Sequence, residues 1–135
     1  MQVRISHLEN VKFAITSGHH TIICDQPASN SGTDEGMTPP ELMLASLGSC
    51  AAYYAAEYLR TRDLAQTGVE VTVNAEKLLK PARLGNFCIQ IATPVQLTAE
   101  QEESMMRCVR SCLIHNTLLS PPEIQIKIGA AVAAE

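Results

Sequence analysis

The longest apolar stretch of the chain runs from Leu42 to Ala56, and no charged residue interrupts it. Thr38, Pro39 and Glu41 precede it in the arrangement of a capping box, with proline at the first helical position. This start and the apolar run predict one helix over Thr38–Arg60. An amphipathic surface helix shows polar residues every third or fourth position, and this one does not. We therefore expect a central helix that is covered on most faces.

Three short runs rich in β-branched residues come before this helix, at Val3–Ile5, Val11–Ile15 and Thr21–Cys24. Because turn-like residues separate them, the pattern predicts an antiparallel meander. Residues 26–37 are rich in Gly, Ser, Asn and Asp, which is typical of a loop. We expect this loop to lead directly into the central helix.

Two strands and a second helix are expected after the central helix. Val69–Lys77 alternates apolar and polar residues, which is typical of a strand with one buried face. Phe87–Ala92 is its expected partner, joined to it by a long connection over Pro81–Asn86. Thr98 and Gln101 then have the spacing of a second capping box and predict the start of a helix.

The second helix carries an apolar stripe that reaches Cys112, and a break is expected over Asn116–Ser120. Pro121-Pro122 prevents the helix from continuing, because proline cannot donate the backbone hydrogen bond. Residues 124–128 alternate isoleucine with polar residues and predict a last strand. The predicted order is βββ-α-ββ-α-β, a single α+β domain over residues 1–135 with long helices against a mainly antiparallel sheet.

Composition and charge exclude several classes of function. The chain has 135 residues, 46% of them hydrophobic and only 4% aromatic, so we expect a core of aliphatic side chains and alanine. A net charge of -4 without a basic cluster argues against a nucleic-acid partner, since phosphate binding requires clustered Lys and Arg. The N-terminus lacks a signal-peptide pattern and the apolar run is shorter than a membrane span. We therefore expect a cytoplasmic protein without a membrane segment.

Candidate chemistry lies in the cysteines. Five cysteines in a chain expected in a reducing compartment favour redox or metal chemistry over a structural disulfide framework. Cys50 lies midway along the apolar helix, among small residues that allow other groups to approach closely. Cys108 and Cys112 lie four residues apart on the second helix and on one face of it, with His115 three residues further on.

Three interpretations of these residues remain open. The two cysteines and the histidine of the second helix would supply three ligands of a zinc site, although no CxxC pair accompanies them. Alternatively the cysteines only pack as small hydrophobic residues, as we expect for Cys24 and Cys88 in their strands. The third interpretation is a redox couple, in which Cys50 on the first helix meets Cys112 or Cys108 on the second.

Two motifs resemble those of the OsmC/Ohr family, which comprises osmotically inducible protein C and the organic hydroperoxide resistance proteins. Residues 36–50, GMTPPELMLASLGSC, are similar to its first motif, in which Gly-x-x-Pro and Glu-Leu precede a helix and a cysteine. Residues 112–118, CLIHNTL, are similar to its second motif, Cys-Pro-Val-His-x-Thr-Leu. The order of the expected elements matches as well, so the resemblance covers nearly the whole chain.

The resemblance implies an intertwined homodimer and a thiol-dependent peroxidase that reduces organic hydroperoxides in the oxidative stress response. The resemblance also implies that Cys50 is the peroxidatic cysteine and Cys112 the resolving cysteine. Cys50 would become a sulfenic acid, which Cys112 would convert to a disulfide. No bound cofactor is implied, since an external thiol or dithiol, on a lipoylated protein or a small molecule, would reduce the disulfide.

The sequence departs from the family pattern in the groups that activate the reactive cysteine. Active members hold an arginine from the early strands with a glutamate at the start of the central helix. Pro40 stands at the position of that glutamate, and Glu41, already assigned to the capping box, follows it. His20 and His115 are the alternative groups for lowering the pKa of Cys50. The departure favours a second hypothesis, a non-catalytic redox sensor or small-ligand-binding dimer. A structural or assembly protein with inert thiols is the third hypothesis.

Overall fold

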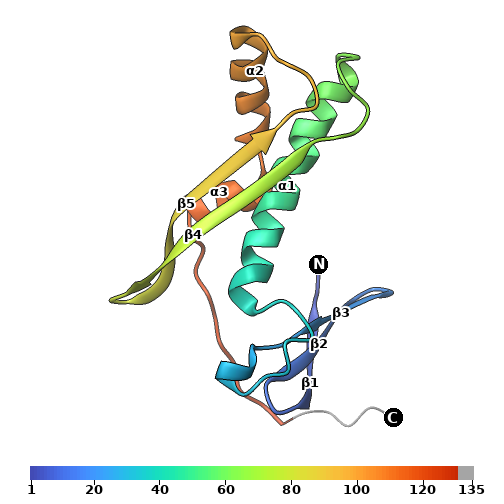
Figure 1. Cartoon of the computed structure of the whole chain (residues 1–135). Coiled ribbons are helices and arrows are strands. Elements are labelled where there is room, and N and C mark those ends of the chain that lie inside the picture. The colour runs from blue at the N-terminus through green and yellow to red at the C-terminus, as the bar shows by residue number, and fades with distance from the viewer. Residues whose placement is uncertain (131–135) are drawn as a thin grey trace.

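The structure, a computed structural model that describes residues 1–130, is organised around one long helix (Figure 1). A β-hairpin and two shorter helices pack against this helix. These elements are α1 (Pro39–Thr61), β4 (Glu70–Leu79), β5 (Ala82–Ala92), α2 (Ala99–Val109) and α3 (Leu113–Leu119). None of the helices in this part of the chain has the length and apolar character needed to cross a membrane.

A separate three-stranded sheet lies beyond the N-terminal end of α1 (Figure 1). It consists of β1 (Arg4–Glu9), β2 (Lys12–Ser17) and β3 (His20–Cys24), antiparallel and in that order. A loop with one 3-10 turn, η1 (Ala28–Asn30), connects it to α1. The predicted meander, loop and central helix are therefore confirmed, and the fold is α+β as expected.

The start of α1 follows from the capping box. The backbone N–H and the hydroxyl of Thr38 donate to the carboxylate of Glu41, at 2.7 and 2.8 Å. Further along α1, Gly48 is buried where a Cβ atom would lie 2.9 Å from the Val73 side chain. The absence of a side chain at Gly48 therefore lets β4 pack closely on α1.

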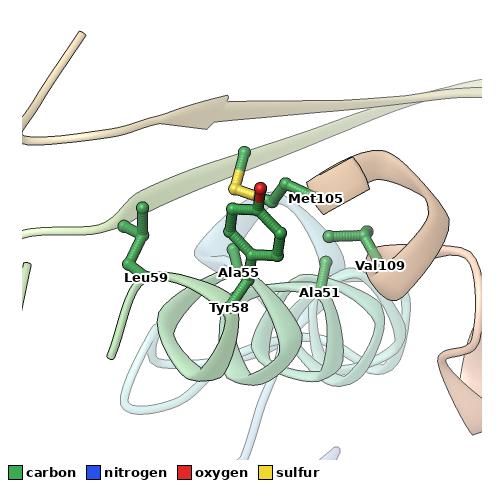
Figure 2. Close-up of a cluster of buried hydrophobic side chains, with 6 residues drawn as sticks. All are labelled: Ala51, Ala55, Tyr58, Leu59, Met105 and Val109. Carbon is green, nitrogen blue, oxygen red and sulfur yellow. The ribbon is translucent and has the colours of Figure 1, made fainter. Parts of the chain in front are cut away.

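The core lies between α1 and α2. Figure 2 shows its six buried side chains, none more than 8% exposed: Ala51, Ala55, Tyr58 and Leu59 on α1, and Met105 and Val109 on α2. Aliphatic residues of β4 and β5, among them Val71, Ile89 and Ile91, pack around this cluster. Only one aromatic residue contributes to the cluster, as the composition predicted.

The expectation of one second helix running past Cys112 is wrong. The N–H groups of Ser111 and Cys112 bond to the carbonyls three residues back, at 3.0 and 3.1 Å, which closes the end of α2 in a tight turn. Cys112 itself has ψ 128°, so the chain leaves the helix there and restarts as α3. The break thus precedes His115, and α3 continues through the region where the break was predicted.

Two further expectations need correction. β5 begins at Ala82, so the predicted loop before Phe87 is mostly strand. The pairing of β4 with β5 shifts register between Asn74 and Glu76, and such a shift interrupts the apolar–polar alternation by which a strand is recognised in a sequence. The predicted last strand is absent from the described part of the chain. Residues 121–130 form no helix or strand, and Ile124, Ile126 and Ile128 are at least 83% exposed.

The central helix is less covered in a single chain than its sequence predicts. Tyr53 is 64% exposed and Met43 37%, and between them the small residues Ala45 and Ser49 also face solvent. One apolar side of α1 therefore has no neighbour among the elements of its own chain that the structure describes.

Candidate active site

A disulfide between Cys50 and Cys112 joins the middle of α1 to the turn before α3. The two Cα atoms lie 5.9 Å apart, within the range that a disulfide requires. Cys108 is a free cysteine. Of the interpretations left open above, the structure contains the thiol couple, with the pairing that the resemblance implied.

The two sulfur atoms have different surroundings. Cys112 is only 1% exposed, whereas Cys50 is half-buried. Cys112 caps α3, and its Sγ atom accepts the backbone N–H of His115 at 3.4 Å. The break between α2 and α3, which the sequence pattern did not predict, therefore creates the position that Cys112 occupies.

An apolar cavity of about 160 Å³ lies beside Cys112. It is lined by side chains from α1, β5 and α2 and from the turn that follows α2: Leu47, Ala51, Ile89, Ile91, Met106, Val109, Arg110, Cys112 and His115. Arg110 is the charged residue of this lining. Sequence reasoning missed it, although its position two residues before a candidate redox cysteine was a usable signal.

His115 is the predicted supporting residue that the structure brings to the disulfide. It lines the cavity together with Cys112 and bonds to the Cys112 sulfur through its backbone. The Nδ1 atom of its ring is buried and has no hydrogen-bond partner among the described residues. A buried polar atom without a partner is uncommon, and the ring that carries it is part of the cavity lining.

Glu41 and His20 lie elsewhere in the single chain. The N–H and hydroxyl of Thr38 lower the pKa of Glu41, which therefore serves the start of α1. Cys50 is roughly 13 Å further along the same helix, at 1.5 Å per residue. His20 is exposed at the beginning of β3, in the sheet beyond the start of α1 (Figure 1).

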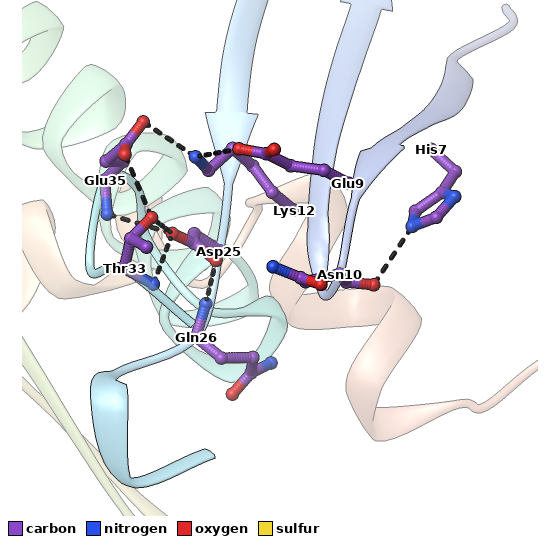
Figure 3. A network of polar contacts seen from close by, with 8 residues as sticks. All are labelled: His7, Glu9, Asn10, Lys12, Asp25, Gln26, Thr33 and Glu35. Carbon is purple, nitrogen blue, oxygen red and sulfur yellow. Dashed lines mark hydrogen bonds and ion pairs between the residues drawn. The ribbon is translucent and has the colours of Figure 1, made fainter. Parts of the chain in front are cut away.

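The loop that leads from β3 into α1 is fixed by Asp25. Its carboxylate accepts the N–H groups of Gln26, Thr33 and Glu35 and the Thr33 hydroxyl, at 2.8 to 3.1 Å (Figure 3). Burial alone would raise the pKa of Asp25, but these donors outweigh it and lower the pKa to about 2. Lys12 bridges Glu9 and Glu35 beside it, at 3.1 and 3.0 Å.

The remaining candidates separate into packing and surface residues. Cys24 is buried, as expected of a packing cysteine, but Cys88 is exposed because it alternates onto the outer face of β5. Within residues 1–130, no group of three or more His, Cys, Asp or Glu side chains could hold a metal ion. The three residues of the zinc interpretation form no such group, since Cys112 is bonded to Cys50.

Comparison with known proteins adds to this geometry. A family model described as OsmC-like protein matches residues 32–127, which is more than half of the chain. The chain belongs to the OsmC-like family. A search of curated proteins gave no match to the sequence.

Solved structures share the OsmC-like fold. A Psychrobacter arcticus protein named for an osmotic stress induced and detoxification response has a TM-score of 0.78 at 18% identity, covering 87% of each chain. An OsmC-like protein from Mycoplasma pneumoniae has a TM-score of 0.71 at 19% identity, covering 89% of this chain and 87% of that one. An organic hydroperoxide resistance protein OsmC from Legionella pneumophila has a TM-score of 0.55 at 15% identity, covering 87% of each. At these identities the likeness concerns the fold.

Proposed function

We propose that this OsmC-like protein is a cytoplasmic thiol-dependent peroxidase that reduces organic hydroperoxides through Cys50 and Cys112. The observation that carries the proposal is the disulfide between α1 and the turn before α3, with Cα atoms 5.9 Å apart. A structural disulfide is uncommon in a reducing compartment, where such bonds are usually catalytic or redox-sensing. Membership of the OsmC-like family supports the same chemistry.

In this proposal Cys50 is the cysteine that meets the peroxide, because it is the more exposed of the two. Its thiolate attacks the terminal oxygen of the O–O bond, the alcohol leaves, and Cys50 becomes a sulfenic acid. The Cys112 thiol then attacks the Cys50 sulfur, which releases water and forms the disulfide. An external dithiol reduces the disulfide by exchange and restores both thiols.

The test is turnover of cumene hydroperoxide with dithiothreitol as reductant. The Cys50→Ser variant is expected to lose turnover to the rate of the uncatalysed mixture, because no thiolate remains to attack the peroxide. Cys112→Ser is expected to be oxidised at Cys50 without forming the disulfide. The exposed cysteine of β5 supplies the control, and Cys88→Ser should turn over like the unmodified protein. Full turnover by Cys50→Ser would contradict the assignment.

A second candidate function, a redox sensor, is favoured because two of the predicted activating groups lie away from the disulfide. Glu41 is bonded to Thr38 at the start of α1, and His20 is exposed at the beginning of β3. The two functions differ in rate. With excess dithiol, a peroxidase rapidly consumes many equivalents of hydroperoxide, whereas a sensor is oxidised once and leaves the remainder.

We also propose that the protein works as a homodimer, because two apolar surfaces of the chain are uncovered. Ile5, Ile15 and Ile22 lie side by side across the three strands of the N-terminal sheet, and Ile5 and Ile22 are at least 50% exposed. The uncovered side of α1 is the other surface. A second copy of the chain would bury both. Light scattering after size exclusion should give twice the mass of one chain, and the mass of one chain would contradict the proposal.

A further inference from the structure

We propose that the reducing dithiol enters the cavity beside Cys112 and attacks the Sγ atom of that cysteine, with Arg110 and His115 as the polar groups that receive it. This inference rests on the proposed function, because it concerns the step that restores the two thiols. It assigns that step to Cys112 and to a cavity on the α2 side of the disulfide.

The position of the two sulfurs supports this direction of attack. Cys112 lines the cavity and Cys50 does not. Only 1% of the Cys112 surface is accessible, and the cavity is the space that this residue borders. Met106 and Arg110 are exposed members of the lining, so the cavity opens to the surface beside the end of α2.

The size and chemistry of the cavity limit what it can hold. Its volume of about 160 Å³ suits one small ring or a short carbon chain, since an engineered cavity of roughly 150 Å³ binds benzene. Most of its walls are aliphatic, which favours an apolar carrier for the thiols. The Arg110 guanidinium attracts the attacking thiolate, and the unpartnered Nδ1 atom of His115 offers a hydrogen-bonding position.

The exchange has two steps. One thiolate of the dithiol bonds to the Cys112 sulfur, the Cys50–Cys112 bond breaks, and Cys50 leaves as a thiolate. The second thiol of the reductant loses its proton and attacks the reductant sulfur in the mixed disulfide. This forms a cyclic disulfide and releases Cys112 as a thiolate. The reductant loses two electrons and two protons, and the two protein thiols gain them.

The direct test traps the mixed disulfide with a monothiol. The protein disulfide is formed with diamide, so the experiment does not depend on peroxidase activity. Benzenethiol, a ring of suitable size, is added briefly, and acid and N-ethylmaleimide then stop the exchange. Trypsin separates the products, because residues 111–127 contain only Cys112 while residues 13–60 contain Cys50 and Cys24.

The expected result is benzenethiol on residues 111–127 and N-ethylmaleimide on Cys50. The reverse labelling, with benzenethiol on Cys50, would overturn the inference. Loss of hydroperoxide turnover would count against the proposed function but would leave this labelling result valid. The two failures are therefore distinguishable.

A matched pair of arginine variants tests the role of the positive charge. Arg110→Gln should slow reduction of the diamide-formed disulfide by dihydrolipoamide about tenfold, the factor that corresponds to one pKa unit of thiolate stabilisation. Its rate should also depend less on ionic strength, and Arg110→Lys should recover part of the rate. Arg107→Gln is the control, since Arg107 is exposed, pairs with Glu103 at 3.1 Å and does not line the cavity. Equal rates for both glutamine variants would overturn the role of Arg110.

Discussion

The part of the chain that carries the disulfide and the N-terminal sheet differ in how their apolar side chains are covered. Between α1 and α2, the chain itself covers six side chains, none of which is more than 8% exposed. In the N-terminal sheet, the row formed by Ile5, Ile15 and Ile22 has no buried member. What holds the end of that sheet is polar, namely the Asp25 carboxylate and the Lys12 ion pairs shown in Figure 3.

The body of the chain, formed by α1, α2, α3 and the β4–β5 hairpin, and the N-terminal sheet depend on different forces. Burial of aliphatic surface stabilises the body and places Cys50 opposite Cys112. Hydrogen bonds to one buried carboxylate fix the loop between the sheet and α1. The candidate redox site therefore has a complete framework within one chain, whereas the sheet has an apolar face that the described elements of its own chain leave open.

The largest expected effect is on the body, through the disulfide. Cys50 and Cys112 are 62 residues apart in sequence, so the bond restricts the unfolded chain strongly. In the chain-entropy account its reduction should lower the free energy of unfolding by about 4 kcal/mol. Urea unfolding with and without dithiothreitol measures this difference. Equal transitions in both would contradict stabilisation by restriction of the unfolded chain.

Truncation of a core side chain should have the next largest effect. Leu59 is 1% exposed in the α1–α2 cluster, and Leu59→Ala should cost about 3 kcal/mol because it removes buried methyl groups and leaves a cavity. Leu79, 83% exposed on β4, gives the control, and Leu79→Ala should cost less than about 0.5 kcal/mol. Similar midpoints for the two variants in urea would contradict the placement of the core.

A smaller and more local effect is expected from Asp25→Asn. The amide cannot accept all the donors of the carboxylate, so the variant should melt several degrees lower at neutral pH. Faster hydrogen exchange is expected at Thr33 and Glu35, with the α1–α2 body unchanged. Asp34→Asn, at an exposed neighbour, is the control.

The same residue gives a pH prediction. Folding lowers the pKa of Asp25 from 3.8 to about 2, so the stability that it contributes is complete above pH 4 and is lost as the pH falls toward 2. The difference in melting temperature between the natural protein and Asp25→Asn should shrink over this window. A difference that stays constant from pH 6 to pH 2 would show that the carboxylate charge is not the cause.

The smallest effect on a single chain is expected at the open face of the sheet. Ile22 is 50% exposed, so Ile22→Thr should change the free energy of unfolding of one chain by less than about 0.5 kcal/mol. If a second copy covers this face, the same variant should weaken self-association in sedimentation experiments. An unchanged dimer would place the interface on another surface.

Local signals predicted much of the fold. The capping boxes at Thr38 and Thr98 located the starts of α1 and α2, and the early strands followed from their β-branched runs. The break before Cys112 was not predicted, because no Gly or Pro marks it and the apolar stripe continues across it. The isoleucine alternation over residues 124–128 predicts a strand, but a strand also requires a partner, which the described part of the chain does not supply.

The candidate site was only partly predictable. The spacing of the cysteines left Cys108 and Cys112 equivalent, and only the resemblance distinguished them. The cavity combines residues from α1, β5, α2 and the following turn, so no single stretch of sequence reveals it. Arg110 and the unpartnered Nδ1 atom of His115 become candidate site groups only because the fold brings these residues to the cavity.

The Cys50–Cys112 redox couple can be tested by a thiol count and intact mass of the reduced protein, before and after one equivalent of cumene hydroperoxide, followed by peptide mapping. A working couple should give a rapid loss of two hydrogen atoms, a bridge that links residues 13–60 to residues 111–127 through Cys50 and Cys112, and its reversal by a dithiol. Thiols that remain unchanged after prolonged exposure would contradict it.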